Sequence, residues 1–405
     1  MNLLETVRGA LFGPWRAVPV LGITQILAWG AIFYPPVLTF PLIAAERGWS
    51  VSFAMGGLST GLLVGGLVSP RVGLAIDRYG GHRVMTAGSL AGALGLVLLV
   101  HVSSKAAYLS VWILLGAAMA ASLYDPAFAT LGRIFGAGAR RPITLLTLAG
   151  GFASTISWPA THVLIGQLGW RGTYLVYAAL LAFVAAPLHA LVLPRTRARV
   201  EPAVVHARAA AAATLPATGW TFALVTFGFA AYAFVPSGLA AHLLAIFGRQ
   251  GLPSGMVVVI GALFGPAQVA ARLFELLFAR RLHPLWLARG ALALLLFAFA
   301  LLAFFGASAA AAASFALLFG AANGLLTIAR GTVPLALFGA AGYGGIVGRI
   351  AGPFLAMQSA APLALAFVAE HVSDAAALMV AAIFAVLALA CFAMLRRPAA
   401  SADGP

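Results

Sequence analysis

The chain has 405 residues, of which 63% are apolar and 8% are charged. A soluble domain of this length would have about a quarter of its residues charged, so the composition excludes one and predicts a membrane protein. The formal charge of +15 does not require a nucleic acid partner, because polytopic membrane proteins collect basic residues on one face of the bilayer. The single cysteine, Cys391, excludes an internal disulfide and a cysteine-based metal site.

The apolar segments predict an all-α membrane protein, because a helix needs about 20 apolar residues to cross the hydrocarbon core. The first 20 residues lack the apolar core and cleavage site of a signal peptide, so we expect a retained cytoplasmic leader. Twelve transmembrane helices are predicted at residues 17–44, 52–74, 83–103, 107–132, 142–166, 172–193, 218–247, 253–279, 285–307, 309–334, 345–369 and 375–395.

Basic residues are distributed unevenly between the two sides of these spans. Of the 24 Lys and Arg residues, 18 fall on the side that holds both termini and four on the other side. The positive-inside rule makes the first side cytoplasmic, so we expect a multi-pass protein of the cell inner membrane with both termini in the cytoplasm. The two remaining arginines, Arg272 and Arg330, lie inside predicted spans.

Two tyrosines stand close to prolines within predicted spans. Tyr34 precedes Pro35 and Pro36 in the first span, and Tyr232 lies four residues before Pro236 in the seventh. Proline bends a helix and frees backbone carbonyls, which a bilayer tolerates only where protein or a cavity covers the gap. The hydroxyl groups of Tyr34 and Tyr232 can therefore bind an anion in a cavity, or the two rings can simply pack against neighbouring helices.

The segment "GLAIDRYGGHR", residues 73–83, lies between the second and third predicted spans. It resembles the signature of the major facilitator superfamily, although histidine replaces the first of the two final bases. Asp77 would lie at the cytoplasmic end of its span, where a helix N-terminus and nearby arginines can hold it. Such a cluster can act as a conformational latch between two halves, or it can be a solvated turn. The predicted latch residues are Gly73, Asp77, Arg78, Gly80 and Arg83.

A narrower resemblance follows along the chain. "ERGWS" after the first span, "YDPAFATLGRIFGAGARRPITLLTLAGGFASTISWP" and "LGWRGTYLVYAALL" are similar to segments of the monocarboxylate transporter group, which includes bacterial oxalate:formate exchangers. The resemblance covers residues 29–195 well and the second half more loosely. It implies transport of a small organic anion, either by proton symport or by exchange.

The longest polar interval, residues 194–217, divides the spans six and six, and we expect a cytoplasmic linker on the anionic inner leaflet. Residues 1–193 and 218–405 are the two predicted domains. "FYPP" and "FVPS" align at an offset of 201 residues, and the tenth span aligns with the fourth at 203 to 204. Parallel six-span repeats predict two pseudo-symmetric six-helix bundles that rock against each other around a central site.

Arg272 lies in the eighth span, at a position to which the resemblance gives a role. The monocarboxylate transporter group carries an acid four residues before an arginine there, and the pair serves substrate binding and proton coupling. Gln268 replaces the acid in this chain, and Pro36 stands where animal members have a lysine. The resemblance therefore implies that Arg272 binds substrate, but it leaves the proton-coupling group unassigned.

A guanidinium group at membrane depth costs at least about 2.5 to 3.5 kcal/mol, so Arg272 needs water, a partner or an anion. Glu275, three residues later, can neutralise it on the same helix. Alternatively, Gly265, Gln268 and Arg272 form a polar stripe that faces a cavity, since they recur at intervals of three and four residues. In the second case Gln268 and Arg272 would both contact the substrate.

Asp125 and Arg330 form a second charged set at matching depths in the fourth and tenth spans. The two side chains can meet across the central cavity, where Arg330 would bind an anion, or each can cap its own helix end. Asp125 is the only acid in the first half that can replace the missing proton carrier. Asp125 and Glu275 are therefore the two candidates for proton coupling.

No His or Cys group has metal-ligand spacing, and neither a nucleotide-binding glycine loop nor a nucleophile elbow is present. We expect a monomeric secondary transporter, not an enzyme, with no cofactor or metal. Its expected partners are a small organic anion, protons if transport is proton-coupled, and the lipid bilayer. The alternative is a major facilitator exporter of amphiphilic drugs or metabolites, because "GRIAGP" in the eleventh span resembles part of the drug/proton antiporter pattern.

Overall fold

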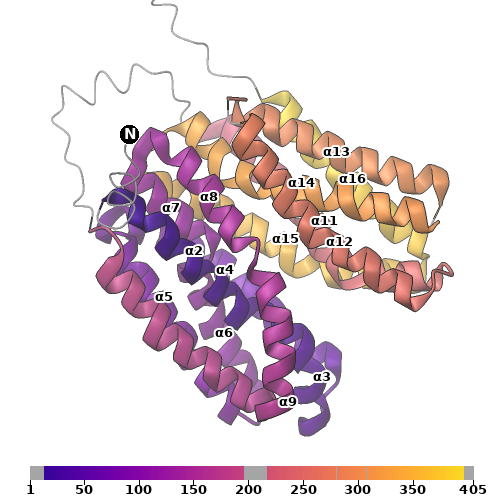
Figure 1. The fold of residues 1–405 in the computed structure, drawn as a ribbon, viewed down its shortest axis with the longest axis horizontal. Coiled ribbons are helices and arrows are strands. Elements are labelled where there is room, and N and C mark those ends of the chain that lie inside the picture. The colour runs from indigo at the N-terminus through magenta and orange to yellow at the C-terminus, as the bar shows by residue number, and fades with distance from the viewer. Residues whose placement is uncertain (1–12, 196–216, 280, 307, 396–405) are drawn as a thin grey trace, which may run out of the picture.

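The computed structural model describes residues 13–195, 217–279, 281–306 and 308–395, and every regular element in these ranges is a helix (Figure 1). This confirms the predicted all-α membrane fold. The elements of the first half are η1 (Pro14–Arg16), α2 (Ala17–Ala28), η2 (Trp29–Phe33), α3 (Pro36–Arg47), α4 (Val51–Tyr79), α5 (Gly81–His101), α6 (Lys105–Ser122), α7 (Tyr124–Phe135), η3 (Gly136–Ala139), α8 (Arg140–Gly150), α9 (Ala153–Leu180), η4 (Leu181–Ala185) and η5 (Leu188–Val192).

The second half contains fewer and longer elements. They are α11 (Gly219–Arg249), α12 (Ser254–Phe274), η6 (Glu275–Ala279), α13 (Pro284–Phe305), α14 (Ala309–Phe338), α15 (Tyr343–His371) and α16 (Asp374–Met394).

Ten helical stretches of the described chain are long and apolar enough to span a membrane, and one of them, Lys105–Val192, has 88 residues. A continuous helix of that length would measure about 130 Å, far more than the roughly 30 Å hydrocarbon core. The α-helical path is interrupted at η3 and at Gly169, whose φ of 66° favours glycine. Division at these two points gives three crossings, which is consistent with the twelve predicted spans.

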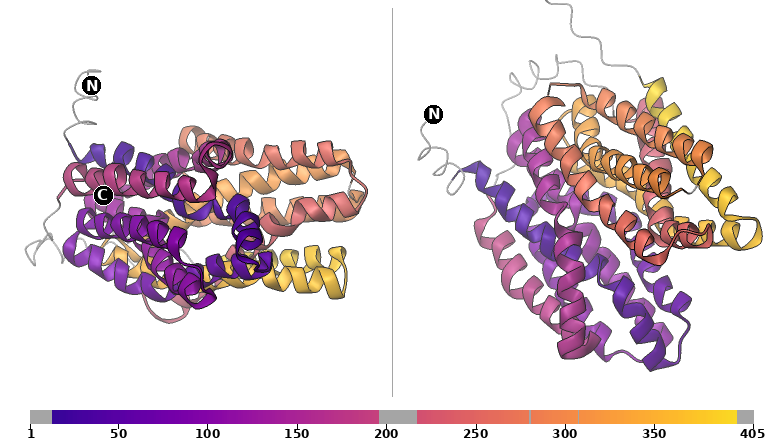
Figure 2. Two further views of the ribbon diagram at one scale, coloured as in Figure 1. Left: turned by 90° about the horizontal axis from the view of Figure 1, so that it is seen from below. Right: turned by 45° about the vertical axis from the view of Figure 1, so that its right-hand side comes forward.

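The helices form two bundles, which Figures 1 and 2 show from different sides. One hydrophobic core is built from α11 to α16, and another lies within the first half of the chain. A third cluster joins residues of the first half, such as Phe128, to Tyr343 and Val347 of α15. The two bundles therefore pack directly against each other. The predicted linker, residues 194–217, lies almost entirely outside the described residues.

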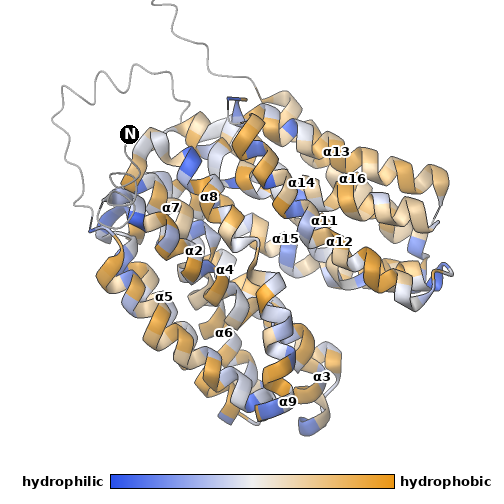
Figure 3. Cartoon of the chain, in the orientation of Figure 1, coloured by the Kyte–Doolittle hydropathy of each residue, from blue (hydrophilic) through white to orange (hydrophobic). Residues whose placement is uncertain are grey.

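The outer surface of both bundles is apolar. Figure 3 shows hydrophobic residues along most of the visible helix faces and hydrophilic residues mainly near the helix ends. Large side chains are strongly exposed in the described chain, for example Phe183 at 80% and Phe304 at 86%. In water such a surface would be unfavourable, whereas lipid tails solvate it.

Three membrane-spanning helices of the first half are interrupted near the contact between the bundles. Between α2 and α3 lie the π-turn η2 and Tyr34. Between α6 and α7 Leu123 is extended, with φ of −86° and ψ of −153°. Between α8 and α9 the helix stops at Gly151 and Phe152. In contrast, α11 and α14 are continuous through the same region, and α11 tolerates the predicted bend site Pro236 without breaking.

Candidate functional site

Arg272 lies where α12 meets the first bundle, and only 3% of the residue is exposed. Its Nη1 donates to the Thr147 carbonyl oxygen of α8 at 2.7 Å. Its Nε donates to the Gly324 carbonyl oxygen and its Nη2 to Oε1 of Gln268, both at 3.4 Å. These two distances are long for hydrogen bonds. The guanidinium group is therefore anchored across the two bundles and retains donor capacity for a further acceptor.

Glu275 is paired with the other bundle. Its Oε1 lies 2.8 Å from Nη2 of Arg140 in α8, and its Oε2 accepts a hydrogen bond from the Thr144 hydroxyl group at 3.1 Å. In the described parts of the chain no carboxylate forms an ion pair with Arg272. Arg272 and Glu275 therefore do not neutralise each other on one helix. The π-turn η6 begins at Glu275, and residues of α8 hold the Glu275 carboxylate.

Asp125 and Arg330 meet across the two bundles. Nη2 of Arg330 lies 2.9 Å from Oδ1 of Asp125, and the side chains are 10% and 13% exposed, respectively. The Arg330 guanidinium carbon lies 4.2 Å from the centre of the Phe354 ring, and the buried Nε of Arg330 has no hydrogen-bond partner among the described residues. Of the two arrangements considered from the sequence, the structure contains the cross-bundle pair. Asp125 also lies in the first turn of α7, whose N-terminus favours a negative charge.

The two predicted tyrosines occupy different surroundings. Tyr232 is 3% exposed, and its hydroxyl group donates to the side-chain oxygen of Asn323 in α14. Tyr34 is half-buried beside Ser154 and lies within electrostatic range of Arg272. Sequence reasoning missed Asn323. Its position two helical turns before Arg330, as an amide in an apolar span, is the signal that points to it.

The predicted latch is only partly assembled from the expected residues. Asp77 accepts hydrogen bonds from the backbone N–H groups of Gly344 at 3.0 Å and Gly345 at 2.7 Å, in the first turn of α15. Gly73 touches the same turn so closely that an added Cβ would lie 2.0 Å from the Gly344 carbonyl oxygen. The N-terminus of a helix from the other bundle thus binds the Asp77 carboxylate.

The remaining residues of the motif stay outside this contact. Arg78 stacks on the ring of Tyr79 at 5.2 Å, and Arg83 is exposed. Gly80 has a φ of 85° at the turn between α4 and α5. The arginine that supports Asp77 is Arg133, which donates to its backbone carbonyl oxygen. Arg133 lies outside the motif, so spacing within the motif does not reveal it.

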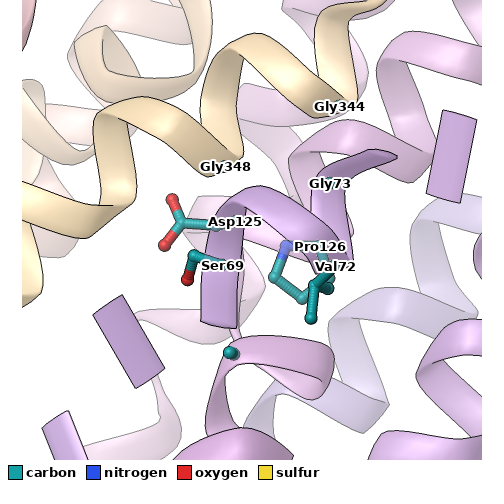
Figure 4. A pocket seen from close by; sticks show the side chains of 8 residues that line it. Ser69, Val72, Gly73, Asp125, Pro126, Gly344 and Gly348 are labelled. Carbon is teal, nitrogen blue, oxygen red and sulfur yellow. The ribbon is translucent and has the colours of Figure 1, made fainter. Parts of the chain in front are cut away.

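A small cavity of about 10 Å³ borders the ion pair on the side of Asp125. Figure 4 shows the Asp125 carboxylate and the Ser69 hydroxyl group pointing to the same side, below the segment of α15 that carries Gly344 and Gly348. This volume is close to the minimum that holds one water molecule. Asp125 therefore lies between Arg330 and a cavity that both bundles line. Across the described residues no cluster of His, Cys, Asp and Glu is arranged to hold a metal ion.

Comparison with known proteins gives three findings. The sequence model of the Major Facilitator Superfamily matches residues 20–351. Human monocarboxylate transporter 11 is 29% identical over 232 residues, which make up 56% of this chain and 48% of that protein, so the match spans about half of the relative. The crystal structure of the human organic anion transporter MFSD10 (TETRAN) is similar with a TM-score of 0.71 at 18% identity, and the match covers 94% of this chain and 99% of that one. At this level of identity the structural similarity supports the fold alone.

Proposed function

The chain belongs to the Major Facilitator Superfamily, and we propose that it is a secondary transporter of a small, monocarboxylate-like organic anion. The superfamily consists of membrane transporters, which alternate between conformations open to either side. One relative is named for monocarboxylates and the fold neighbour for organic anions, and both names favour an anionic substrate.

Arg272 carries this proposal. Four arginines of the described chain, Arg140, Arg171, Arg249 and Arg330, form ion pairs, and all four are more exposed than Arg272, for which the structure shows no ion pair among the described residues. Arg272 is bound by two backbone carbonyls and one amide, and these acceptors are neutral. A buried arginine without a counter-ion is costly at membrane depth, and an anion would remove that cost. A carboxylate matches the planar donors of a guanidinium group well.

Gln268, Tyr34 and Tyr232 complete the proposed binding site around Arg272. Gln268 accepts from the guanidinium group and has its own amide N–H groups as further donors. Tyr34 lies at the interruption between α2 and α3, within electrostatic range of Arg272, and its hydroxyl group is a further donor for an anion. We assign Tyr232 an orienting role through Asn323.

Arg330 and Asp125 supply the proposed coupling. A substrate carboxylate that binds Arg330 competes with Asp125 for the same guanidinium group. Protonation of Asp125 would release Arg330 to the substrate, and loss of the proton would restore the ion pair. This scheme gives proton-coupled transport, and a second anion in place of the proton gives exchange. Glu275 already binds Arg140 and Thr144, so we assign it to the contact between the bundles and place coupling on Asp125.

We further propose that the protein is a monomer in the cell inner membrane with both termini cytoplasmic. The contacts of Asp77 and Glu275 with the opposite bundle then lie on the cytoplasmic side, where the basic loops are found. Both contacts would have to open before substrate could exchange with the cytoplasm.

The test is uptake of radiolabelled acetate, lactate and oxalate into proteoliposomes, with and without a pH gradient. Arg272→Ala should lower uptake by about 100-fold, because a charge-assisted, two-point contact is lost. Arg272→Lys should retain part of it. Arg71→Ala removes an exposed arginine of α4 and should leave uptake unchanged. Unchanged uptake in Arg272→Ala would remove Arg272 from the site, and extrusion of lipophilic cations without anion uptake would favour the exporter.

A further inference from the structure

Gln25 is fully buried in α2 and uses every hydrogen-bonding group of its side-chain amide. The amide nitrogen donates to the carbonyl oxygens of Ser122 at 2.8 Å and Leu123 at 3.2 Å. The amide oxygen accepts a hydrogen bond from the indole N–H of Trp29 at 3.1 Å. A primary amide has two N–H donors and one carbonyl oxygen, so no group of Gln25 remains for a substrate.

The two acceptors lie at the interruption between α6 and α7. In a continuous helix the Ser122 carbonyl would receive the N–H of residue 126, but that residue is Pro126, which has none. A free backbone carbonyl costs several kcal/mol inside a membrane. Gln25 supplies the missing donor from another helix. The Leu123 carbonyl also accepts from the Ala127 backbone at 3.3 Å, so Ser122 depends most on Gln25.

Asp125 lies directly beside this interruption, in the first turn of α7. The course of the backbone at Leu123 sets where α7 begins, and hence where the short Asp125 side chain points. Trp29, which holds the oxygen of Gln25, also packs on Tyr124 with ring centres 5.2 Å apart and on Tyr34 at 6.0 Å. One amide thus connects the interruption near Tyr34 with the interruption near Asp125.

We propose that Gln25 is a positioning residue that holds Asp125 toward Arg330. It acts through the backbone of Ser122 and Leu123 and touches neither substrate nor proton. The role rests on the proposed function, in which Asp125 exchanges Arg330 for a proton when substrate binds. Loss of Gln25 would displace α7 and weaken the pairing of Asp125 with Arg330 while leaving the hydrogen bonds of Arg272 to Thr147, Gly324 and Gln268 in place.

The groups around Asp125 allow a pH-dependent change in binding to be assigned to Asp125 itself. Arg330 of α14 is its ion-pair partner, and Tyr343 of α15 is the titratable group of that helix within electrostatic range. The lining residues contributed by α4 are Ser69, Val72 and Gly73, which do not titrate in the accessible pH range. Tyr124 precedes Asp125 on α7, and tyrosine titrates far above neutral pH. Among these neighbours, Asp125 is the group whose charge changes in the acidic to neutral range.

Gln25→Leu removes the amide at nearly constant volume, and Thr24→Val is the matched control. Thr24 is equally buried on the same helix, but its hydroxyl group bonds to His189 at 2.9 Å, away from the interruption. The readout is the rise in unfolding temperature that acetate, lactate or oxalate causes in purified protein over a pH series. This measurement reports binding and does not require turnover.

We expect carboxylate binding by the natural chain to weaken as pH rises through a midpoint. In Gln25→Leu the midpoint should move upward by about one pH unit, because a carboxyl group with a weaker arginine contact keeps its proton to higher pH. Thr24→Val should not move it. Trp29→Phe keeps an aromatic ring but removes the indole N–H that holds the amide oxygen of Gln25. It should therefore move the midpoint in the same direction by a smaller amount, and it tests the proposal if Gln25→Leu does not fold.

A cycle with Asp125→Asn separates positioning from general structural damage. In that background pH dependence should disappear, and Gln25→Leu should change carboxylate affinity less than twofold. An equal effect of Gln25→Leu with and without Asp125 would overturn the proposal, as would a natural chain that binds carboxylate independently of pH. Failure of the proposed function would give a different result. In that case none of the three carboxylates would raise the unfolding temperature of the natural chain or be taken up by proteoliposomes that contain it.

Discussion

The two bundles carry equivalent ion pairs between the end of their first membrane span and the start of their last, but with opposite polarity. Glu46 of α3 pairs with Arg171 of α9 at 2.5 Å in one bundle, and Arg249 of α11 pairs with Asp374 of α16 at 2.6 Å in the other. Each residue of the first pair lies 203 positions before its counterpart. Because polarity is reversed while pairing is kept, attraction between two helices is what this position requires, and the sign of either charge is free.

The centre of the molecule does not have this freedom. The first bundle contributes Asp125 beside an interrupted helix, and the second contributes Arg272 and Arg330 from regular turns of α12 and α14. An arginine side chain is long enough to reach the opposite bundle from a regular helix. An aspartate is short, so the backbone must bring it there. The two bundles are therefore alike as scaffolds and different as chemical partners.

The largest expected effect comes from exchanging the central pair. Asp125→Arg combined with Arg330→Asp restores opposite charges, but it leaves a short carboxylate on a regular helix and a long guanidinium group at the interruption. We expect carboxylate uptake into proteoliposomes to fall by about 100-fold or more, as for loss of a buried charge pair. Recovery of uptake in the double variant would show that the bundles are interchangeable here as well.

The next effect tests the seam between α4 and α15, where the bundles touch backbone to backbone. Gly73→Val should slow uptake by about 10-fold or more, because a Cβ at this position would collide with the Gly344 carbonyl oxygen and hold the bundles apart. Gly56→Val on the same helix is the control, since no atom of the described residues lies within 4 Å of an added Cβ there. Equal initial uptake rates for the two variants would contradict the idea that α4 and α15 must come into this close contact during transport.

A smaller effect is expected at the hydroxyl group of Tyr232. Tyr232→Phe leaves Asn323 without its donor and should raise the KM of carboxylate uptake about fivefold, since one neutral hydrogen bond is lost. Tyr174→Phe removes a hydroxyl group that bonds to Thr39 within the first bundle and should not alter KM. A KM change of the same size in both variants would point to general loosening.

The smallest effect is expected for the outer pairs. Arg249→Asp with Asp374→Arg copies the polarity of the other bundle, and uptake should change less than about twofold, because an exposed ion pair contributes about 1 kcal/mol or less. Each single substitution places like charges together and should lower the unfolding temperature more than the double variant does. If uptake falls as far as in the central exchange, the distinction between scaffold and site is not valid.

Much of this organisation could be predicted from residue order. The apolar segments predict the membrane fold, and the resemblance to major facilitators agrees with the family match. Arg272, Arg330 and Asp125 stand out because charge at membrane depth is costly and therefore needs a partner. Burial cost depends on residue type and depth, and both can be read from the chain.

The partners themselves could not be read in this way. Glu275 is three residues from Arg272 but binds Arg140, and Asp77 is held by Arg133 and by the first turn of α15. The sequence does not indicate a role for Gln25, since a single amide in an apolar span fits many surroundings. These contacts depend on how two bundles are rotated and how close their backbones come.

Residue composition and spacing alone are enough to predict that this protein crosses a membrane, to which family it belongs and where its costly charges lie, because they govern partition into lipid. The packing of the two bundles sets which charges pair, leaves Arg272 without a carboxylate partner among the described residues, and brings Gln25 to the carbonyl that Pro126 cannot serve. Hydrogen bonds and ion pairs act over about 3 Å, and a distance that short between remote segments is set by packing.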